Sequence, residues 1–238
     1  RDGATFLYER ATALAAQTLT DASAGYRVTT DRGTHDARAL LLAFGRTRRR
    51  LQIPGEAEFT GRGVSAYKPG DAKRVDGQAV AVVGGGNSAL TAATRLAEHC
   101  PKVYLVNRAD RFAGEAITIA RANAAPAIER LTKTFVTRVE GQNHVERIIV
   151  ADDPQGGSPR PLHVQAVFVE IGFDANPELV RGFVDMTPQG DIATDIFGAT
   201  SQPGVYAAGD CTAIPYRQIV ISAGQGATAA LALYQYFQ

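Results

Sequence analysis

Apolar residues in the middle of the chain gather in short continuous runs, and each run is closed by Gly, Pro or charged residues. Residues 79–83 read AVAVV and residues 102–106 read KVYLV, both of strand length. Between them, residues 87–99 carry helix-forming side chains until Pro101 ends the pattern. A strand, a helix and a second strand in this order predict a βαβ unit with a parallel sheet and a right-handed crossover.

The first 45 residues show three different patterns. Residues 6–19, FLYERATALAAQTL, combine helix-forming residues with an apolar face and predict a helix. Residues 26–33 alternate and end in a turn, so they predict a strand that enters a hairpin. Residues 39–43, ALLLA, form a continuous apolar run closed by Gly45, which is typical of a strand covered on both faces.

The last two fifths of the chain contain a hairpin pattern and then a strand–loop–helix pattern. VERIIVADD and PLHVQAVFVEIG flank the turn-rich PQGGSPR and predict a hairpin. GVYAAGD predicts a further strand, and the Ala-rich residues 222–237 predict a helix. Because helices and strands alternate through most of the chain, we predict an α/β fold.

Composition and charge narrow the class of partner. Hydrophobic residues make up 45% and charged residues 21% of the 238 residues, which is ordinary for a soluble globular protein. The formal net charge of +1 gives no electrostatic sign of a nucleic-acid or membrane partner. Arg46 and residues 48–50 form one dense basic run, which we interpret as a solvated loop rather than an anion site because Pro54 and Gly55 follow.

Cysteine and histidine form no metal-binding pattern. Cys100 and Cys211 are far apart, no CxxC occurs, and the four histidines are scattered, so we expect no metal site. No signal peptide and no apolar run of transmembrane length is present. We therefore expect a cytoplasmic enzyme or binding protein.

The strongest motif is Gly84-x-Gly86-x-x-Ala89, directly after a predicted strand and at the start of a predicted helix. Gly84 permits a tight turn, Gly86 lets a pyrophosphate approach the backbone, and Ala89 allows the helix to pack closely on the strand. The helix N-terminus supplies free N–H groups and positive potential. We predict dinucleotide binding; the alternative is a structural strand–helix turn.

The end of the following strand indicates which nicotinamide cofactor is used. An NAD site usually has an acidic residue there for the ribose 2′-hydroxyl. This chain instead has Arg108 and Arg111, whose guanidinium groups match a 2′-phosphate, while Asp110 is expected on the turn. NADP(H) is favoured over NAD(H), with solvated arginines as the alternative.

A third group of residues follows the strand GVYAAGD. Asp210 offers a carboxylate for sugar-like hydroxyl groups, and a loop with the sequence PYRQ leads into a helix of small residues, whose N-terminus suits an electron-rich group. Taken alone, this pattern also fits an ordinary strand–loop–helix.

Together these segments closely resemble the thioredoxin reductase-like flavoproteins, the class II pyridine nucleotide-disulfide oxidoreductases, which include the flavoprotein subunit of alkyl hydroperoxide reductase. The matching stretches, in family order, are IPGEAEFTGRGVSA, AVVGGGNSAL, VNRADRF, VFVEIGFDANPEL and GVYAAGDCTAIPYRQIVISAGQGATAAL. They run across nearly the whole chain.

The resemblance implies two Rossmann-like, three-layer nucleotide-binding domains. A NAD(P)H-binding domain, residues 76–176, would be inserted into an FAD-type domain formed by residues 1–75 and 177–238. The family's own first GxGxxG, which holds the FAD pyrophosphate, is absent, so the N-terminal part of the FAD-type domain is missing here. We expect either a fragment of a longer protein or a chain that cannot hold FAD in the usual way. A homodimer is also implied.

The resemblance also assigns cofactor residues. Asp210 would contact the ribityl or pyrophosphate region of FAD, and residues 217–219 would lie against the flavin. No catalytic side chain is implied within the chain. The implied cofactor-binding residues are Gly84, Gly86, Asn87, Ser88, Arg108 and Arg111 for the nicotinamide cofactor, with Gly172, Gly209, Asp210, Arg217, Gln218 and Ile219 beside them.

Two departures from the family pattern affect its chemistry. The usual HRRDxFRA appears as NRADRFA, so Ala109 and Ala113 replace two arginines and weaken the case for NADPH. The family's CxxC-Asp appears as Tyr67-Lys68-Pro69-Gly70-Asp71, which leaves no redox dithiol. A redox role for Cys211 is disfavoured because buried cysteine usually behaves as a small apolar residue.

Three functions remain. The first is an FAD-dependent NAD(P)H oxidoreductase that transfers hydride from NADPH to flavin and then to an acceptor other than its own dithiol. That acceptor could be a ferredoxin- or flavodoxin-like protein, a quinone, oxygen or an external disulfide. The alternatives are a non-catalytic NAD(P)H- or FAD-binding or sensing module, and a thioredoxin-disulfide reductase whose dithiol lies outside this chain. We favour the first.

Overall fold

The computed structural model describes residues 3–21 and 23–238, which form two compact units. One unit consists of the residues before 48 and after 172, and the other of residues 48–172. The chain passes between them at β5 (Thr47–Arg48) and β14 (Phe173–Asp174), and these two short strands pair with each other. The units are described separately below.

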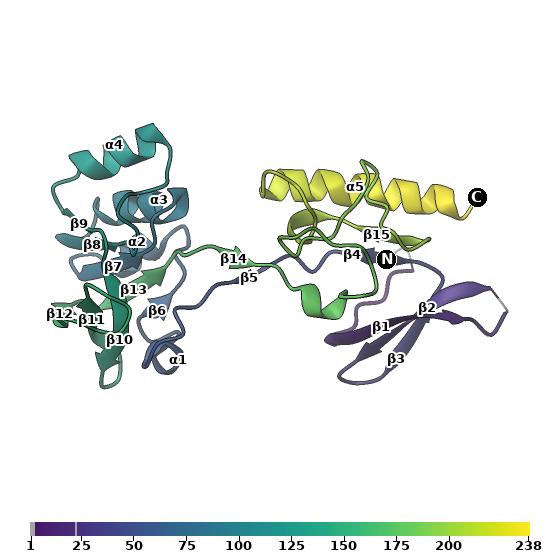
Figure 1. The fold of residues 1–238 in the computed structure, drawn as a ribbon, viewed down its shortest axis with the longest axis horizontal. Coiled ribbons are helices and arrows are strands. Elements are labelled where there is room, and N and C mark those ends of the chain that lie inside the picture. The colour runs from purple at the N-terminus through teal and green to yellow at the C-terminus, as the bar shows by residue number, and fades with distance from the viewer. Residues whose placement is uncertain (1–2, 22) are drawn as a thin grey trace. The chain divides into compact units, whose positions relative to one another are not determined.

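The 48–172 unit is built around a five-stranded parallel sheet (Figure 1). Its strand order is β6-β13-β7-β8-β9, and each sequence-predicted strand at 79–83 and 102–106 has the predicted bounds. The sheet strands are β6 (Val64–Ser65), β7 (Ala79–Val83), β8 (Lys102–Val106), β9 (Ile128–Leu131) and β13 (Ala166–Val169).

Each face of this sheet is covered by a different layer (Figure 1). Val80 and Val82 pack against the helices, whereas Ala81 and Val83 pack against a three-stranded antiparallel sheet. The continuous apolar runs therefore arise because β7 and β8 are buried on both sides. The covering elements are α1 (Glu56–Phe59), α2 (Asp71–Arg74), α3 (Asn87–Leu96), α4 (Ala116–Ala124), β10 (Phe135–Gly141), β11 (Val145–Ala151) and β12 (Arg160–His163).

The predicted hairpin is confirmed for β11 and β12, which pair antiparallel from Arg147 with His163 to Val150 with Arg160. The apolar run that follows is divided between two sheets, because β13 leaves the hairpin and joins the parallel sheet between β6 and β7. One apolar run therefore contributes to two layers.

The other unit places a two-stranded parallel sheet, β4 (Leu40–Leu42) with β15 (Val205–Ala207), beneath the long helix α5 (Ile219–Tyr236) (Figure 1). Tyr206 and Ala208 pack on Ala229 of α5, while Leu42 and neighbouring residues face the opposite core. The helix begins three residues before the predicted start at 222. The remaining elements are β1 (Ala11–Thr18), β2 (Ala24–Thr30), β3 (Thr34–Ala37) and the 3₁₀ turns η1 (Pro177–Leu179) and η2 (Gly209–Cys211).

Two predictions for the first 45 residues are wrong. No helix forms at 6–19. Residues 11–18 form strand β1, which pairs antiparallel with β2 through partners such as Leu14 and Val28, and residues 6–10 lie outside any helix or strand. Strand pairing thus overrides the helix propensity of the alanines. The run 39–43 does form β4, but Leu41 is 41% exposed, so the strand is not covered on both faces.

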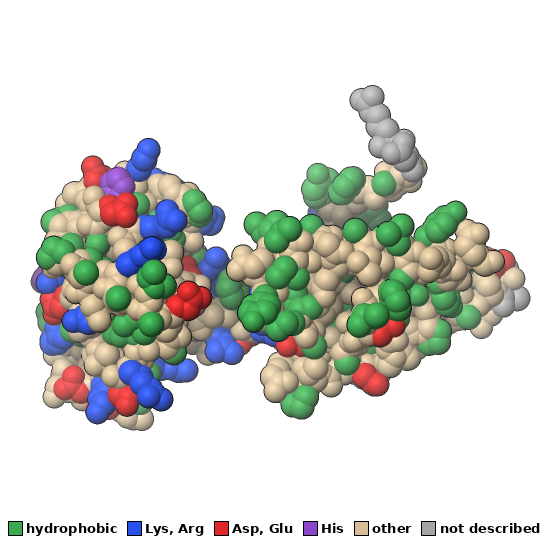
Figure 2. Space-filling view, turned by 90° about the horizontal axis from the view of Figure 1, so that it is seen from above, with side chains coloured by type: hydrophobic (Ala, Val, Ile, Leu, Met, Phe, Trp, Pro, Cys, Tyr) green, Lys and Arg blue, Asp and Glu red, His purple; other side chains and the backbone are tan. Residues whose placement is uncertain are grey.

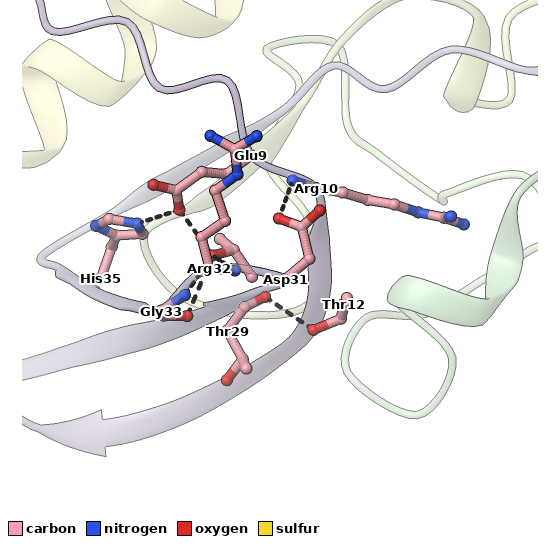
Figure 3. A network of polar contacts seen from close by, with 9 residues as sticks. Glu9, Arg10, Thr12, Thr29, Asp31, Arg32, Gly33 and His35 are labelled. Atoms are coloured by element: carbon pink, nitrogen blue, oxygen red, sulfur yellow. Dashed lines mark hydrogen bonds and ion pairs between the residues drawn. The ribbon is translucent and has the colours of Figure 1, made fainter.

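The predicted strand 26–33 does enter a hairpin, and a polar network stabilises its turn (Figure 3). Glu9 accepts hydrogen bonds of 2.7 Å from both Thr30 and the His35 ring. Asp31 accepts one of 3.0 Å from the backbone N–H of Arg10. The hydrogen bonds to His35 and Thr30 hold the pKa of Glu9 below its usual value.

The unit boundaries lie at 47/48 and 172/173, whereas the sequence-based boundaries were 75/76 and 176/177. The difference arises because residues 48–75 pack with the parallel sheet. β6 pairs with β13 at its edge, and Phe59, Val64 and Ala72 enter its two cores.

None of the described helices is both long and apolar enough to cross a bilayer. Within residues 3–21 and 23–238, no three metal-ligating side chains are grouped to hold an ion.

The packing between the two sheets of the 48–172 unit gives a stability prediction. Ile148 is fully buried between them, so Ile148→Ala should lower the free energy of unfolding by about 2–5 kcal/mol in a denaturant titration. Ile117, on α4, is 59% exposed, and Ile117→Ala should change the free energy of unfolding by less than about 1 kcal/mol. Equal losses in the two variants would contradict this core assignment.

Candidate functional site

The turn from β7 to α3 can be made only by glycine at position 84. Gly84 has a φ of +149°, and a Cβ atom there would overlap the carbonyl oxygen of Glu170, the residue that follows strand β13. The Ala89 side chain, fully buried, would lie 3.0 Å from the same Cβ. The close approach of strand, turn and helix predicted from the motif is therefore present.

Gly86, in contrast to Gly84, has open space where a side chain would lie. It is the N-cap of α3 with a φ of −93°, no side chain caps the helix, and a Cβ atom there would have nothing within 4 Å. The first-turn N–H groups of an uncapped helix favour an anion. Asn87 and Ser88 lie at this open end, so the geometry can hold a phosphate.

The Asn87 side chain is occupied by the loop before α4. Its Oδ1 accepts the backbone N–H of Glu115 at 2.7 Å, and its Nδ2 donates to the Glu115 carboxylate at 3.3 Å. A ligand at the start of α3 would therefore meet the backbone of Asn87 rather than its amide.

Asn107, at the carboxyl end of β8, organises the loop that carries Arg108 and Arg111. This residue is 6% exposed, donates to the Arg111 carbonyl at 2.9 Å and accepts the N–H of Ala109 at 3.2 Å. A Cβ on Gly85 would lie 2.6 Å from its amide nitrogen. No role for Asn107 was predicted from the sequence, although a polar residue directly after a buried strand was a usable signal.

A cavity of about 450 Å³ lies between this loop, α4 and β9. Asp110, Arg111 and Phe112 line it. Arg130 from β9 lines it too, and its guanidinium hydrogen-bonds to Asn123. Arg108 does not line it. Arg130 was not predicted because only the strand order β7-β8-β9 brings it beside the loop.

In the other unit, Gly209 and Asp210 lie between β15 and α5. Gly209 has a φ of +78° and donates its N–H to Gln225 at 2.9 Å. The Asp210 carboxylate accepts the Ser222 hydroxyl at 3.1 Å. Asp210 is thus held against the first turns of the helix.

Residues 48–50 of the basic run are exposed, as a solvated loop predicts, but Arg46 contradicts that prediction. Its side chain is 13% exposed, forms an ion pair with buried Asp191 and donates to the Asp210 carbonyl at 3.1 Å. Arg217 also pairs with Asp191, at 3.3 Å. Two guanidinium groups therefore share one buried carboxylate, which ties the chain before β5 to the loop before α5.

Large apolar side chains are exposed around the start of α5. Ile219 is 92% exposed and Val220 76%, while Gln218 is the N-cap. Figure 2 shows hydrophobic side chains gathered over this helix. Such a surface would suit a flat, largely apolar ring.

The predicted residues are divided into two sets, one in each unit, and Arg108 is exposed and lies outside the cavity that Arg111 lines. Gly172 belongs to neither set: it lies where the chain leaves the 48–172 unit, with a φ of +93°, and accepts the N–H of Arg49 at 3.0 Å.

Both cysteines are free and 3% exposed. Burial raises the pKa of Cys100 to about 11 and also raises the pKa of Cys211. Their thiols approach backbone carbonyls, Cys100 that of Val75 at 3.4 Å and Cys211 that of Ala208 at 3.2 Å. Neither has the lowered pKa of a reactive thiol.

Residues 67–71, which carry no thiols, are held by side-chain hydrogen bonds to their backbone. The N–H of Tyr67 donates to the Glu170 carboxylate at 2.8 Å, and the N–H of Lys68 donates to Asp71 at 2.8 Å. Gly70, with a φ of +97°, is the N-cap of α2. Asp71 therefore stabilises its own turn.

A glycine turn opening into an uncapped helix, on a parallel sheet covered on both faces, is the arrangement found in dinucleotide-binding α/β proteins. Residues 5–232 match the pyridine nucleotide-disulphide oxidoreductase family, and the chain belongs to that family. This confirms both the predicted resemblance and the α/β fold class. Thioredoxin reductases of this family use FAD and NADPH.

Curated relatives and solved structures agree with this assignment. The chain is 40% identical over 199 residues to thioredoxin reductase of Mycolicibacterium smegmatis, covering 83% of this chain and 64% of that one. It is 34% identical over 204 residues to a subunit of alkyl hydroperoxide reductase from Pseudomonas aeruginosa, covering 86% of this chain and 39% of the relative. Lactococcus lactis thioredoxin reductase superposes with a TM-score of 0.79 at 26% identity, over 97% of this chain and 74% of that one. The chain thus spans about two fifths of the length of the Pseudomonas relative.

The two motif glycines should respond differently to the same substitution. Gly84→Ala should lower the free energy of unfolding by at least about 2 kcal/mol, because the methyl group overlaps a backbone carbonyl. Gly86→Ala should leave stability within about 1 kcal/mol, since its Cβ meets open space. Thermal unfolding followed by circular dichroism compares the two, and a stable Gly84→Ala protein would refute the close approach.

The thiols should be unreactive in the native protein. At neutral pH, a chromogenic aromatic disulfide should label neither Cys100 nor Cys211 on the timescale of free cysteine, because burial keeps both protonated and inaccessible. Both should react once the protein is unfolded in denaturant. Rapid labelling of native Cys211 would reinstate it as a redox candidate.

Proposed function

We propose that the protein is an FAD-dependent NAD(P)H oxidoreductase that passes electrons to an acceptor other than a dithiol of this chain. The observation that carries this proposal is the β7–α3 turn, where Gly84 permits the close approach and Gly86 leaves the helix end open. Family membership supports the same reaction class.

The residues of the 48–172 unit fit a nicotinamide dinucleotide. The backbone at Gly86 and Asn87 would bind the pyrophosphate, which needs no side chain at position 86 and can approach closely because none is there. Arg111 and Arg130 line one cavity beside the end of β8, where a ribose 2′-substituent is expected. Asp110 lines the same cavity, so two cations face one carboxylate there, and this excess of positive charge favours NADP(H) over NAD(H).

The residues of the other unit fit part of a flavin site. The Asp210 carboxylate, held by Ser222 at the start of α5, would accept hydrogen bonds from ribityl hydroxyl groups. Ile219 offers an exposed apolar surface, and Arg217 is positioned by Asp191. When bound, FAD would supply the capacity to accept a hydride from the nicotinamide and release electrons to the acceptor.

The absence of a thiol at positions 67 and 70 supports an acceptor different from that of a conventional thioredoxin reductase. Tyr67 and Gly70 occupy the two positions where the family resemblance places sulfurs, and Cys100 and Cys211 are buried. The sequence-based alternatives, a binding module and a reductase with its dithiol elsewhere, remain open. A homodimer also stays a proposal; Leu231 and Tyr234 of α5, 68% and 64% exposed, offer apolar contact area for it.

The decisive experiment is anaerobic mixing of the purified, FAD-loaded protein with NADPH. The visible flavin absorbance should fall, because hydride transfer reduces the flavin. Arg111→Met should raise the NADPH concentration for half-maximal bleaching about tenfold, as expected for loss of one charge-assisted hydrogen bond. The value for NADH should stay unchanged.

Arg121→Met is the matched control, because Arg121 is an exposed residue of α4 that does not line the cavity. Flavin that stays oxidised would refute the oxidoreductase function and favour the binding module. Equal effects of Arg111→Met on NADPH and NADH would refute the 2′-phosphate assignment.

A further inference from the structure

A second cavity in the 48–172 unit, about 490 Å³ in volume, lies between α3 and the segment that replaces the family's dithiol. Tyr67 and Pro69 form one wall, and the α3 residues Ser88, Thr91 and Arg95 form the opposite one. Its volume falls in the range of small-molecule sites. It touches the proposed dinucleotide site only at the first turn of α3.

Positive charge dominates this cavity. Arg48 and Arg95 both line it, against a single carboxylate, that of Glu170. The Glu170 side chain is 7% exposed and already accepts the N–H of Tyr67 and an ion pair from Arg48 at 3.3 Å. Asp71 does not line the cavity and pairs with Arg74 at 3.8 Å.

Arg95 is the cation that remains available. Across residues 3–21 and 23–238, no carboxylate forms an ion pair with it, and it lies on an exposed face of α3. Arg95 and Tyr67 line the same cavity. Burial raises the pKa of Tyr67, and the charge of Arg95 acts against that rise while Asp71 and Glu98 add to it. A cation beside a hydroxyl-bearing aromatic ring suits a carboxylate attached to an apolar body.

The apolar wall is held in place before any ligand binds. The Tyr67 ring packs edge-on against buried Phe168, with centroids 5.7 Å apart and planes at 78°. Its N–H is held by Glu170, and the turn behind it is closed by Asp71. A wall fixed in this way needs little ordering when a ligand arrives.

We propose that this cavity binds a small organic carboxylate, with the carboxylate on Arg95 and the Thr91 hydroxyl and the apolar part against Tyr67 and Pro69. The position that holds a dithiol in relatives would then be a binding site for an anionic small molecule. The proposal concerns binding alone and does not depend on hydride transfer.

Calorimetric titration of the purified protein with benzoate tests the proposal. Benzoate should bind with a dissociation constant on the order of 1 mM, whereas the neutral analogue benzyl alcohol should bind at least tenfold more weakly. Arg95→Gln should weaken benzoate binding about tenfold. Because glutamine keeps helix propensity on an exposed face, this variant should unfold at the wild-type temperature.

Arg121→Gln is the control, since it removes the same charge from another exposed helix position without touching the cavity. Benzoate should also bind when the protein is saturated with NADPH. The proposal is overturned if benzoate does not bind, if benzyl alcohol binds equally well, or if Arg95→Gln has no effect. Competition between benzoate and NADPH would overturn it too, by making the cavity part of the dinucleotide site.

Discussion

The contact between Gly84 and the carbonyl of Glu170 is the constraint on which the 48–172 unit depends. Because no side chain fits between the end of β7 and the end of β13, the chain must turn there without a Cβ. That turn directs the uncapped end of α3 outward and buries Ala89 against the strand. Beyond the same carbonyl, the Glu170 side chain reaches the backbone of Tyr67. One crowded point thus positions both the proposed dinucleotide site and the wall of the second cavity.

In the other unit, the constraint is a buried carboxylate paired with two arginines. Asp191 is 6% exposed and is neutralised by Arg46 and Arg217 together. Removing either arginine alone would leave a buried carboxylate with half its compensation, a situation that costs more than the loss of a surface pair. Asp191 holds the loop that precedes α5 by binding Arg217. Its other partner, Arg46, lies 145 positions before it in the chain.

Sequence patterns predicted the elements whose structure depends on nearby residues. They failed where pairing with a distant segment determines the structure. The runs at 79–83 and 102–106 show burial on both faces by themselves, so β7 and β8 were predicted with their bounds. Residues 6–19 look helical in isolation, and only pairing with β2 makes a strand of them. Arg130 and Arg46 could not be assigned either, because the first depends on the strand order and the second on a distant buried aspartate. Asn107 could have been found, since a polar side chain at the end of a buried strand calls for hydrogen-bond partners.

The two ends of the 48–172 unit are close together: the backbone N–H of Arg49 donates to the carbonyl of Gly172 at 3.0 Å, and β5 pairs with β14 beside it. A unit whose first and last residues are neighbours can be inserted into a surface loop of another domain with little change to that domain. During evolution such a unit could be inserted, deleted or replaced as a whole while the fold of the flanking residues stays the same.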